Sequence, residues 1–223
     1  MYKKICRKCS KPYETEEDKL IFCSTDCEKA AKKERYESYV KDEIRKNIPL
    51  KYRDIESDRK DLINRFIGSS LFITGSSGVG KTVLMASIVK RLIREEKEVC
   101  WIGYSSFIMG LQSMFKQDRG EKTVTIGDYI IKESPYDYVD RIACFKGFLC
   151  IDDIGAEKLT DFVRQITYYI VNEREQWMLP LIITSNFSLA QIDEMIDPRI
   201  SSRIAGMCET IKLTGKDRRL KNV

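Results

Sequence analysis

The segment Gly75–Thr82 limits what this chain can fold into more than any other, because it completes the pattern G-x-x-x-x-G-K-[ST]. An apolar run, Leu71–Ile73, precedes it, and from Val83 onward apolar residues recur at the spacing of a helix. The pattern binds phosphate in this strand–loop–helix context. Its glycines let backbone N–H groups form a cup, and the start of the helix adds positive partial charge. The sequence therefore predicts a site for ATP or GTP.

Each residue of this loop has an expected part in holding the nucleotide. Lys81 is expected to reach the β- and γ-phosphates, and the Thr82 hydroxyl is expected to bind Mg²⁺. A glycine-rich turn with a chance lysine is the structural alternative, which the flanking strand and helix disfavour. The residues predicted to contact the nucleotide here are Gly75, Ser76, Ser77, Gly78, Val79, Gly80, Lys81 and Thr82.

Two carboxylates end a second apolar run, Phe148–Asp153. Asp152, at the end of the predicted strand, is expected to hold Mg²⁺, and Asp153 to position or polarise an attacking water. A capped strand end is the structural alternative. Many related ATPases carry the longer Glu as the second carboxylate, and small misplacements near reacting atoms can cost ~10²-fold in rate. We therefore expect slow hydrolysis, which suits a switch more than a motor.

Two later segments add polar groups. The apolar run Leu181–Ser185 ends at Asn186, and ligands of parallel sheets bind at the carboxyl ends of the strands, so Asn186 is expected near the γ-phosphate or the attacking water. Arg199 and Arg203, four residues apart, lie on one helical face. They form either a solvated basic face or an arginine finger that reaches the γ-phosphate of a neighbouring copy.

Four of the eight cysteines lie within the first 27 residues. They form two pairs, Cys6-x2-Cys9 and Cys23-x3-Cys27, whose spacing suits tetrahedral Zn²⁺ bound by four thiolates. The second pair straddles the predicted start of a basic helix with Ser24 as its N-cap, a pattern that resembles treble-clef zinc modules.

This cysteine segment is too small to bury a core by itself. A short hairpin is expected within residues 10–22 with Pro12 at its turn, and structural Zn²⁺ would add ~10–16 kcal/mol to such a fold. Free or oxidised thiols are the alternative. Four thiolates leave no open position for catalysis, so the segment predicts a scaffold that binds a partner, either protein or DNA.

The composition limits the setting in which this chain works. No apolar run among the 223 residues approaches the ~20 needed to cross a bilayer, and the N-terminus has no apolar signal core, so we expect a cytoplasmic protein. The net charge of +5 permits contact with nucleic acid without demanding it. The chain has no histidine, so any metal site must use thiolates or carboxylates.

Predicted strands alternate with predicted helices from Ser69 onward, which indicates an α/β fold whose parallel sheet is covered on both faces. Before them, a charged helix over 28–46 is expected to break near Asn47. The predicted domains are a zinc-binding module with a basic helix (1–40), a linker (41–68) and a nucleotide-binding core (69–223). Strands are expected at 71–74, 99–104, 148–152, 181–185 and 209–213, and helices near 83–95, 106–116, 126–133 and 161–177.

Six segments, taken in order, resemble the helicase loader family of DnaC and DnaI, of which the transposon helper ATPase IstB is a close relative. The similarity covers about residues 45–220, and its Asp-Asp-Ile-Gly-Ala-Glu-Lys and Ser-Ser-Arg stretches are distinctive beyond any generic phosphate loop. The segments are Ile48-Pro49-x-x-Tyr52-Arg53, Gly75–Thr82, Ile151–Lys158, Thr184–Asn186, Arg199–Arg203 and Gly215–Arg219.

The resemblance implies an AAA+ ATPase core of the initiator/loader clade. The C-terminal helical lid of many AAA+ proteins is expected to be absent, since the chain ends at Val223. An aromatic residue usually stands at the position of Arg218 in this family. The implied roles are a Walker B pair at Asp152 and Asp153, sensor 1 at Asn186, an arginine finger acting in trans at Arg203, and a terminal sensor-type arginine at Arg219.

The resemblance also implies partners. Members of this family bind single-stranded DNA and a replicative hexameric helicase, and their N-terminal segment, zinc-binding in the DnaI-like branch, commonly docks the helicase. The cysteine segment of this chain is shorter than that pattern and uses cysteines only. Phe107, Phe115 and Lys116 stand where the clade carries its DNA-contacting helix, although an apolar stripe also suits the core. We therefore expect an ATP-controlled helicase loader that self-associates with ATP bound.

Three other functions compete with this interpretation. A transposition helper of the IstB type would remodel duplex DNA for a transposase, but the cysteine segment suits a dedicated docking domain. A small-molecule P-loop kinase would need a second substrate pocket and leaves the Ser-Ser-Arg stretch unexplained. A DNA-binding adaptor with a vestigial site would have no use for intact Lys81, Thr82, Asp152 and Asp153.

Overall fold

The computed structural model describes residues 1–116, 122–126, 129–155 and 160–218. Contacts along the chain divide it into two compact units, Met1–Lys46 and Asn47–Val223, here called the N-terminal unit and the core unit. The stretch 41–68, predicted as a linker, holds the end of a helix, a short 3-10 turn (Leu50–Tyr52) and helix α2 (Lys60–Phe66).

The N-terminal unit is a small hairpin followed by one long helix. Strand β1 (Tyr2–Ile5) pairs antiparallel with β2 (Pro12–Thr15), and α1 runs from Thr25 to Asn47, where the sequence predicts its break. The predicted place of the hairpin was wrong, because Pro12 opens the second strand instead of forming the turn. Proline at the first position of an edge strand costs no ladder hydrogen bond, which leaves the turn to the segment that carries Cys6 and Cys9.

The core unit is built on a five-stranded sheet. All neighbouring strands in it run parallel, in the spatial order β4-β7-β8-β3-β9. Strand β3 therefore lies inside the sheet, and the loop that follows it opens at the carboxyl edge next to the end of β8. The strands are β3 (Leu71–Thr74), β4 (Val99–Gly103), β7 (Phe148–Ile154), β8 (Leu181–Ser185) and β9 (Glu209–Lys212).

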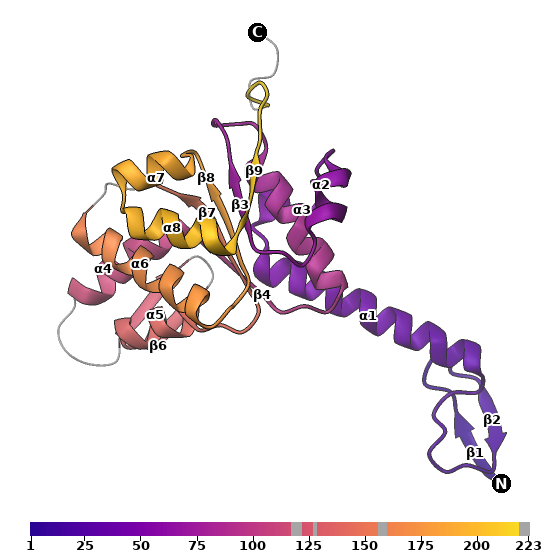
Figure 1. Cartoon of the computed structure of the whole chain (residues 1–223). Coiled ribbons are helices and arrows are strands. Elements are labelled where there is room, and N and C mark those ends of the chain that lie inside the picture. The colour runs from indigo at the N-terminus through magenta and orange to yellow at the C-terminus, as the bar shows by residue number, and fades with distance from the viewer. Residues whose placement is uncertain (117–121, 127–128, 156–159, 219–223) are drawn as a thin grey trace. The chain divides into compact units, whose positions relative to one another are not determined.

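Helices cover both faces of this sheet (Figure 1). Helix α3 packs against one face, and apolar side chains of α4 to α8 form one buried cluster with the other. This arrangement confirms the predicted α/β fold with a covered parallel sheet. The helices are α3 (Lys81–Arg94), α4 (Tyr104–Lys116), α5 (Pro135–Ala143), α6 (Asp161–Gln176), α7 (Leu189–Met195) and α8 (Pro198–Met207).

One predicted helix is a hairpin instead. The stretch 126–133, expected to be helical, belongs to strands β5 (Lys122–Ile126) and β6 (Tyr129–Glu133), which pair antiparallel. The segment is rich in β-branched residues, which favour strands over helices. The helix begins later, at Pro135, where the Ser134 side chain accepts a hydrogen bond from the backbone of Asp137 as an N-cap.

A buried arginine forms hydrogen bonds at the amino ends of two strands of the sheet. Arg174 on α6 is fully buried, and its guanidinium donates to backbone carbonyls just before β7 and β8, those of Gly147 and Pro180. Burial lowers the pKa of Arg174 to about 10. Because these carbonyls accept from a terminal nitrogen of the buried cation, Arg174 links the amino ends of the two strands whose carboxyl ends carry the predicted site.

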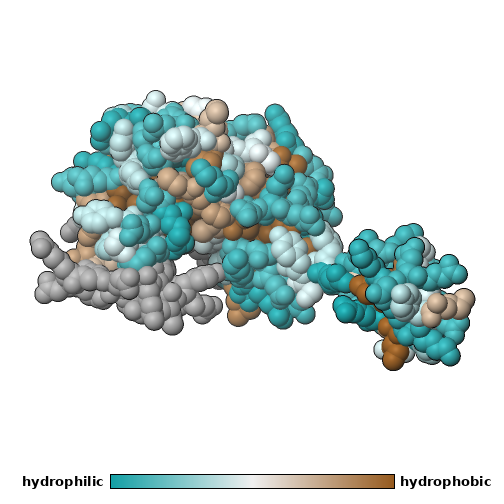
Figure 2. Space-filling view, turned by 90° about the horizontal axis from the view of Figure 1, so that it is seen from below, coloured by the Kyte–Doolittle hydropathy of each residue, from teal (hydrophilic) through white to brown (hydrophobic). Residues whose placement is uncertain are grey.

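Outside the core, polar groups dominate. Figure 2 shows a face on which hydrophilic side chains predominate and apolar ones are scattered. Within the described ranges, no helix combines the length and the apolar character needed to cross a membrane.

Candidate nucleotide site and cysteine cluster

The predicted phosphate loop joins β3 to α3 in a conformation that requires its glycines. Gly75, Gly78 and Gly80 have φ angles of 152°, 75° and 99°, in the region that disfavours residues with a side chain. A Cβ atom on Gly75 would lie 2.3 Å from the carbonyl oxygen of Leu213. The loop therefore keeps its curvature only with glycine at these positions, and its backbone is free to approach a phosphate closely.

Lys81, the first residue of α3, points its ammonium group into the loop. Its Nζ atom donates to the carbonyl oxygens of Gly75 (2.8 Å) and Ser76 (3.0 Å) and to Oδ1 of Asn186 (2.7 Å). The residue is only 7% exposed. A cation that points into a glycine-rich loop is well placed to bind an anion, because its charge-assisted hydrogen bonds to phosphate are stronger than those to carbonyl and amide oxygens.

Asp152 lies between two threonine hydroxyls. Its Oδ1 accepts hydrogen bonds from Thr82 (3.0 Å) and Thr184 (2.7 Å). Burial raises the pKa of the Asp152 carboxyl, and the two hydroxyl donors only partly oppose that rise. A carboxylate and a hydroxyl together are hard oxygen ligands of the kind Mg²⁺ prefers. The donor set therefore fits the expected metal, whose charge would offset the cost of burying the carboxylate.

A bulge in β7 brings both carboxylates to the site. Ile151 pairs with Ile183 and Ile154 with Ser185, so Asp152 and Asp153 together stand opposite one residue, Thr184. The Thr184 hydroxyl bonds Asp152 and also accepts from the backbone N–H of Asp153 (2.8 Å). Asp153 has a φ of 64°, a conformation rare for residues other than glycine. Strained positions of this kind cluster at functional sites.

Asn186 connects the two halves of the site. Its Oδ1 accepts from Lys81, and its Nδ2 donates to Oδ1 of Asp153 at 2.9 Å. The predicted residues of the phosphate loop, the two carboxylates and Asn186 are thus brought together at the carboxyl ends of β3, β7 and β8. Asn186 therefore links Lys81, which would bind a phosphate, to Asp153.

A cavity of about 350 Å³ opens over this network. Its lining includes Lys51, Ile55 and Arg218, which the sequence did not predict as site residues, and Tyr52, which was predicted only as part of the family pattern. The Tyr52 ring stacks against Trp101 with centroids 6.4 Å apart. No motif marks Lys51, which lies in the short 3-10 turn, or Ile55, which follows that turn, because both are far from the loop in sequence. The cavity is lined by Lys51, Tyr52, Ile55, Ser77, Gly78, Gly80, Lys81, Thr82, Val83, Asp152, Asp153, Asn186 and Arg218.

Arg203 lies elsewhere, on α8, and is not among the described residues that line this cavity. Its guanidinium donates to Oδ1 of Asn172 (3.1 Å) and the hydroxyl of Tyr168 (3.2 Å) and forms an ion pair with Glu175 (3.2 Å). These three partners sit on one face of α6. Arg203 is therefore held in a set orientation at a surface remote from the walls of its own site.

The remaining residues predicted to contact a phosphate or DNA are not among the described residues that line this cavity. Arg199 pairs with Asp197 at 2.8 Å on the same helix as Arg203. Arg219 lies outside the described residues, as does the side chain of Lys116. Phe107 is 1% exposed within the core cluster, so the suggestion that it stacks on DNA bases is wrong, and the apolar stripe buries it instead. Phe115 is 37% exposed and contacts Tyr136 and Phe162 edge-on.

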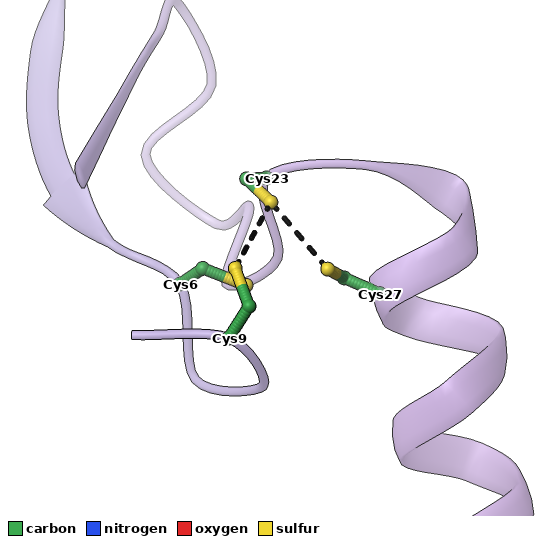
Figure 3. A group of neighbouring side chains, drawn as sticks. All are labelled: Cys6, Cys9, Cys23 and Cys27. Carbon is green, nitrogen blue, oxygen red and sulfur yellow. Dashed lines mark hydrogen bonds between the residues drawn. The ribbon is translucent and has the colours of Figure 1, made fainter. Parts of the chain in front are cut away.

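The four predicted cysteines come together in the N-terminal unit (Figure 3). All four Sγ atoms of Cys6, Cys9, Cys23 and Cys27 lie within 4.8 Å of one another, and Cys23 is 3.6 Å from Cys9 and 3.5 Å from Cys27. Tetrahedral Zn–S bonds of 2.3 Å would separate the sulfurs by about 3.8 Å. The Ser24 hydroxyl accepts from the backbone N–H of Cys27, which confirms the predicted N-cap.

The charge state of this cluster also suits a cation. Burial of the Cys6 thiol opposes its ionisation, but backbone groups of Cys9 and Cys23 that bond to its sulfur lower its pKa to about 6. The neighbouring thiols of Cys27 and Cys9 raise the pKa of Cys23 to about 12. The first thiolate therefore forms readily and suppresses the next, a repulsion that a bound divalent cation would relieve.

Comparison with known proteins now bears on this geometry. No family model matches the chain. The curated replicative helicase loader DnaI of Bacillus subtilis (strain 168) is 26% identical over 165 residues, which cover 68% of this chain and 48% of that protein. This chain resembles the DnaC/DnaI-type helicase loaders. The resemblance drawn from its sequence segments is thus confirmed, while the chain spans about half the length of its curated relative.

Solved structures support the same fold. A crystal structure of the DnaC helicase loader has a TM-score of 0.53 at 20% identity, and covers 70% of this chain and 85% of that one. A DnaI crystal structure has a TM-score of 0.54 at 23% identity, covering 80% and 93%. AMPPCP-bound DnaA from Aquifex aeolicus has a TM-score of 0.55 at 16% identity, covering 77% and 53%. The predicted AAA+ core is therefore confirmed as a fold.

Replacing Asp152 by Asn should raise stability and weaken Mg²⁺-dependent binding. The raised pKa of Asp152 makes its ionised form unfavourable in the metal-free protein, so the free energy of unfolding falls as pH rises above the ordinary carboxyl pKa. Urea denaturation without Mg²⁺ should show this fall in the wild type and its absence in Asp152→Asn. The same variant should bind Mg·ATP about 10- to 100-fold more weakly, as loss of one charged ligand predicts.

Asp161→Asn, an exposed carboxylate on α6, is the control and should match the wild type in both measurements. If Asp152→Asn binds Mg·ATP as tightly as the wild type, Asp152 is not a metal ligand.

Proposed function

We propose that this protein is an ATP-controlled cytoplasmic helicase loader for DNA replication, which binds single-stranded DNA and a replicative hexameric helicase. The observation that carries the proposal is the hydrogen-bonded set of Lys81, Asn186 and Asp153 at the mouth of the cavity. It supports a working ATPase site on a chain whose curated relative is a replicative helicase loader.

The chain's own residues have distinct parts in this proposal. Backbone N–H groups of the loop and Lys81 bind the phosphates, while Thr82 and Asp152 hold Mg²⁺, which neutralises charge on the phosphates when bound. Asp153 orients the attacking water, and Asn186 links that group to Lys81. The Asp153 carboxylate already accepts a hydrogen bond from Asn186, and the backbone of Asp153 donates one to Thr184. The Asp side chain is also shorter than the Glu of many ATPases, so we expect slow hydrolysis.

We further propose that Arg203 completes the site of a neighbouring copy when the protein self-associates with ATP. Its orientation by Tyr168, Asn172 and Glu175 supports this role, because a finger that is already ordered loses less freedom when it meets a phosphate. Arginine fingers contribute 10³–10⁵-fold in rate where they act.

Arg203→Ala should therefore bind ATP as the wild type does but lose at least ~10²-fold in steady-state hydrolysis. Mixing it with Lys81→Ala, which keeps the finger but lacks the phosphate lysine, should restore part of the activity because each copy supplies what the other lacks. Arg91→Ala, an exposed arginine on α3 paired with Glu95, serves as the control. Unchanged turnover in Arg203→Ala would contradict a finger acting in trans.

The cysteine cluster is proposed to bind one structural Zn²⁺ and so to shape the surface that docks the helicase. The four convergent sulfurs support this, since four thiolates leave no position for catalysis.

Capture of the host's replicative helicase by the full chain, with ATP present, tests the proposed function. The wild type should carry about one Zn²⁺ and retain the helicase, whereas a Cys23→Ser/Cys27→Ser variant should lose both and still bind ATP. Cys144→Ser, a cysteine outside the cluster, is the matched control. Failure of the zinc-loaded wild type to retain the helicase would reject the loader, and ATP-dependent remodelling of duplex DNA would then favour a transposition helper of the IstB type.

A further inference from the structure

The segment that follows β9 folds back over the phosphate loop. The backbone N–H of Arg218 donates to the carbonyl of Gly78 at 3.0 Å. The Asp217 carboxylate fills the space beside the same glycine, where a Cβ atom would fall 1.7 Å from its Oδ1. Residues 217 and 218 are therefore seated on the loop itself and not merely near it.

This seating places the Arg218 guanidinium where phosphates are expected. A Cβ atom on Gly80 would lie 3.9 Å from Nε and 4.0 Å from Cζ of Arg218. Arg218 also lines the same cavity as Lys81 and Thr82. A planar guanidinium over a glycine-rich loop is suited to bidentate contact with phosphate oxygens.

The guanidinium is engaged by a carboxylate from another part of the chain. Its two terminal nitrogens donate to the two carboxylate oxygens of Asp58, at 3.0 Å and 3.1 Å, in an end-on bidentate pair. The two side chains are 48% and 64% exposed, and exposed ion pairs of this kind contribute little to stability. Arg59 separately donates to the carbonyl of Thr214 at 3.2 Å, so the segment stays attached when the Arg218 pair is broken.

We propose that Arg218 contacts the phosphate chain of a bound nucleoside triphosphate, and that Asp58 competes with the nucleotide for it. This inference deepens the proposed function and rests on its nucleotide site. Binding exchanges one exposed carboxylate for a more highly charged phosphate group, so the exchange favours a triphosphate over a diphosphate. Arg219, to which the family resemblance gives a sensor role, lies outside the described residues. The contact proposed here belongs to its neighbour Arg218, which lines the cavity.

Equilibrium binding of Mg·ATP and Mg·ADP to the full chain tests the inference through opposite effects of the two partners. Arg218→Gln should weaken ATP binding about 10-fold or more and ADP binding about 2-fold, as loss of a charge-assisted contact predicts. Asp58→Asn should instead tighten ATP binding about 3-fold, because the competitor is removed. The double variant should behave like Arg218→Gln, and Arg91→Gln, which alters an exposed pair outside the cavity lining, should change nothing.

A purely structural ion pair predicts a different pattern, in which both single variants weaken binding alike and lower the melting temperature alike. That result, or unchanged affinity in both, would overturn the inference while leaving the proposed function standing. A wild type that binds neither nucleotide would reject the two together.

Discussion

One hydrogen-bonded network at the carboxyl edge of the sheet is the interaction on which the rest of the site depends. Asn186 accepts from Lys81 and donates to Asp153, and Asp152 accepts from Thr82 and Thr184, so the ends of two strands, β7 and β8, and the first turn of α3 are joined by side chains. Lys81 and Thr184 are buried, and each hydrogen-bonded partner constrains the next. A phosphate or metal entering it must exchange with existing contacts, which couples the ligand to the positions of the strand ends.

The bulge in β7 makes this network possible. Without the extra residue opposite Thr184, neighbouring side chains of a regular strand would point to opposite faces of the sheet, and only one carboxylate would reach the edge. The bulge turns Asp152 toward Thr82 and Asp153 toward Asn186, at the cost of a left-handed backbone at Asp153. The two neighbouring carboxylates therefore have different partners at one strand end. In the N-terminal unit, the four cysteine sulfurs converge where a larger domain would have a hydrophobic core.

Much of this could be predicted because the informative residues carry local signals. The phosphate loop, the strand ends at Asp152 and Asn186, and the paired cysteines each combine a residue type with a spacing that few other structures use. Signals failed where long-range contact decides the outcome. The β-branched residues of 122–133 favour the hairpin that forms, but the sequence pattern suggested a helix there. The bulge in β7 has no sequence marker. Lys51, Ile55 and Arg218 reach the cavity only because distant segments fold over the loop, which no spacing reveals.

Lys81 and its network are proposed to form a working nucleotide site, and the other proposed functions depend on it. Calorimetric titration of the full chain with Mg·ATP tests this directly, comparing the wild type with Lys81→Ala and with Arg91→Ala, an exposed arginine on the same helix that pairs with Glu95 outside the cavity lining. We expect saturable one-site binding that Lys81→Ala weakens about 100-fold or more and that Arg91→Ala leaves unchanged. Equal affinity in the wild type and Lys81→Ala would contradict it.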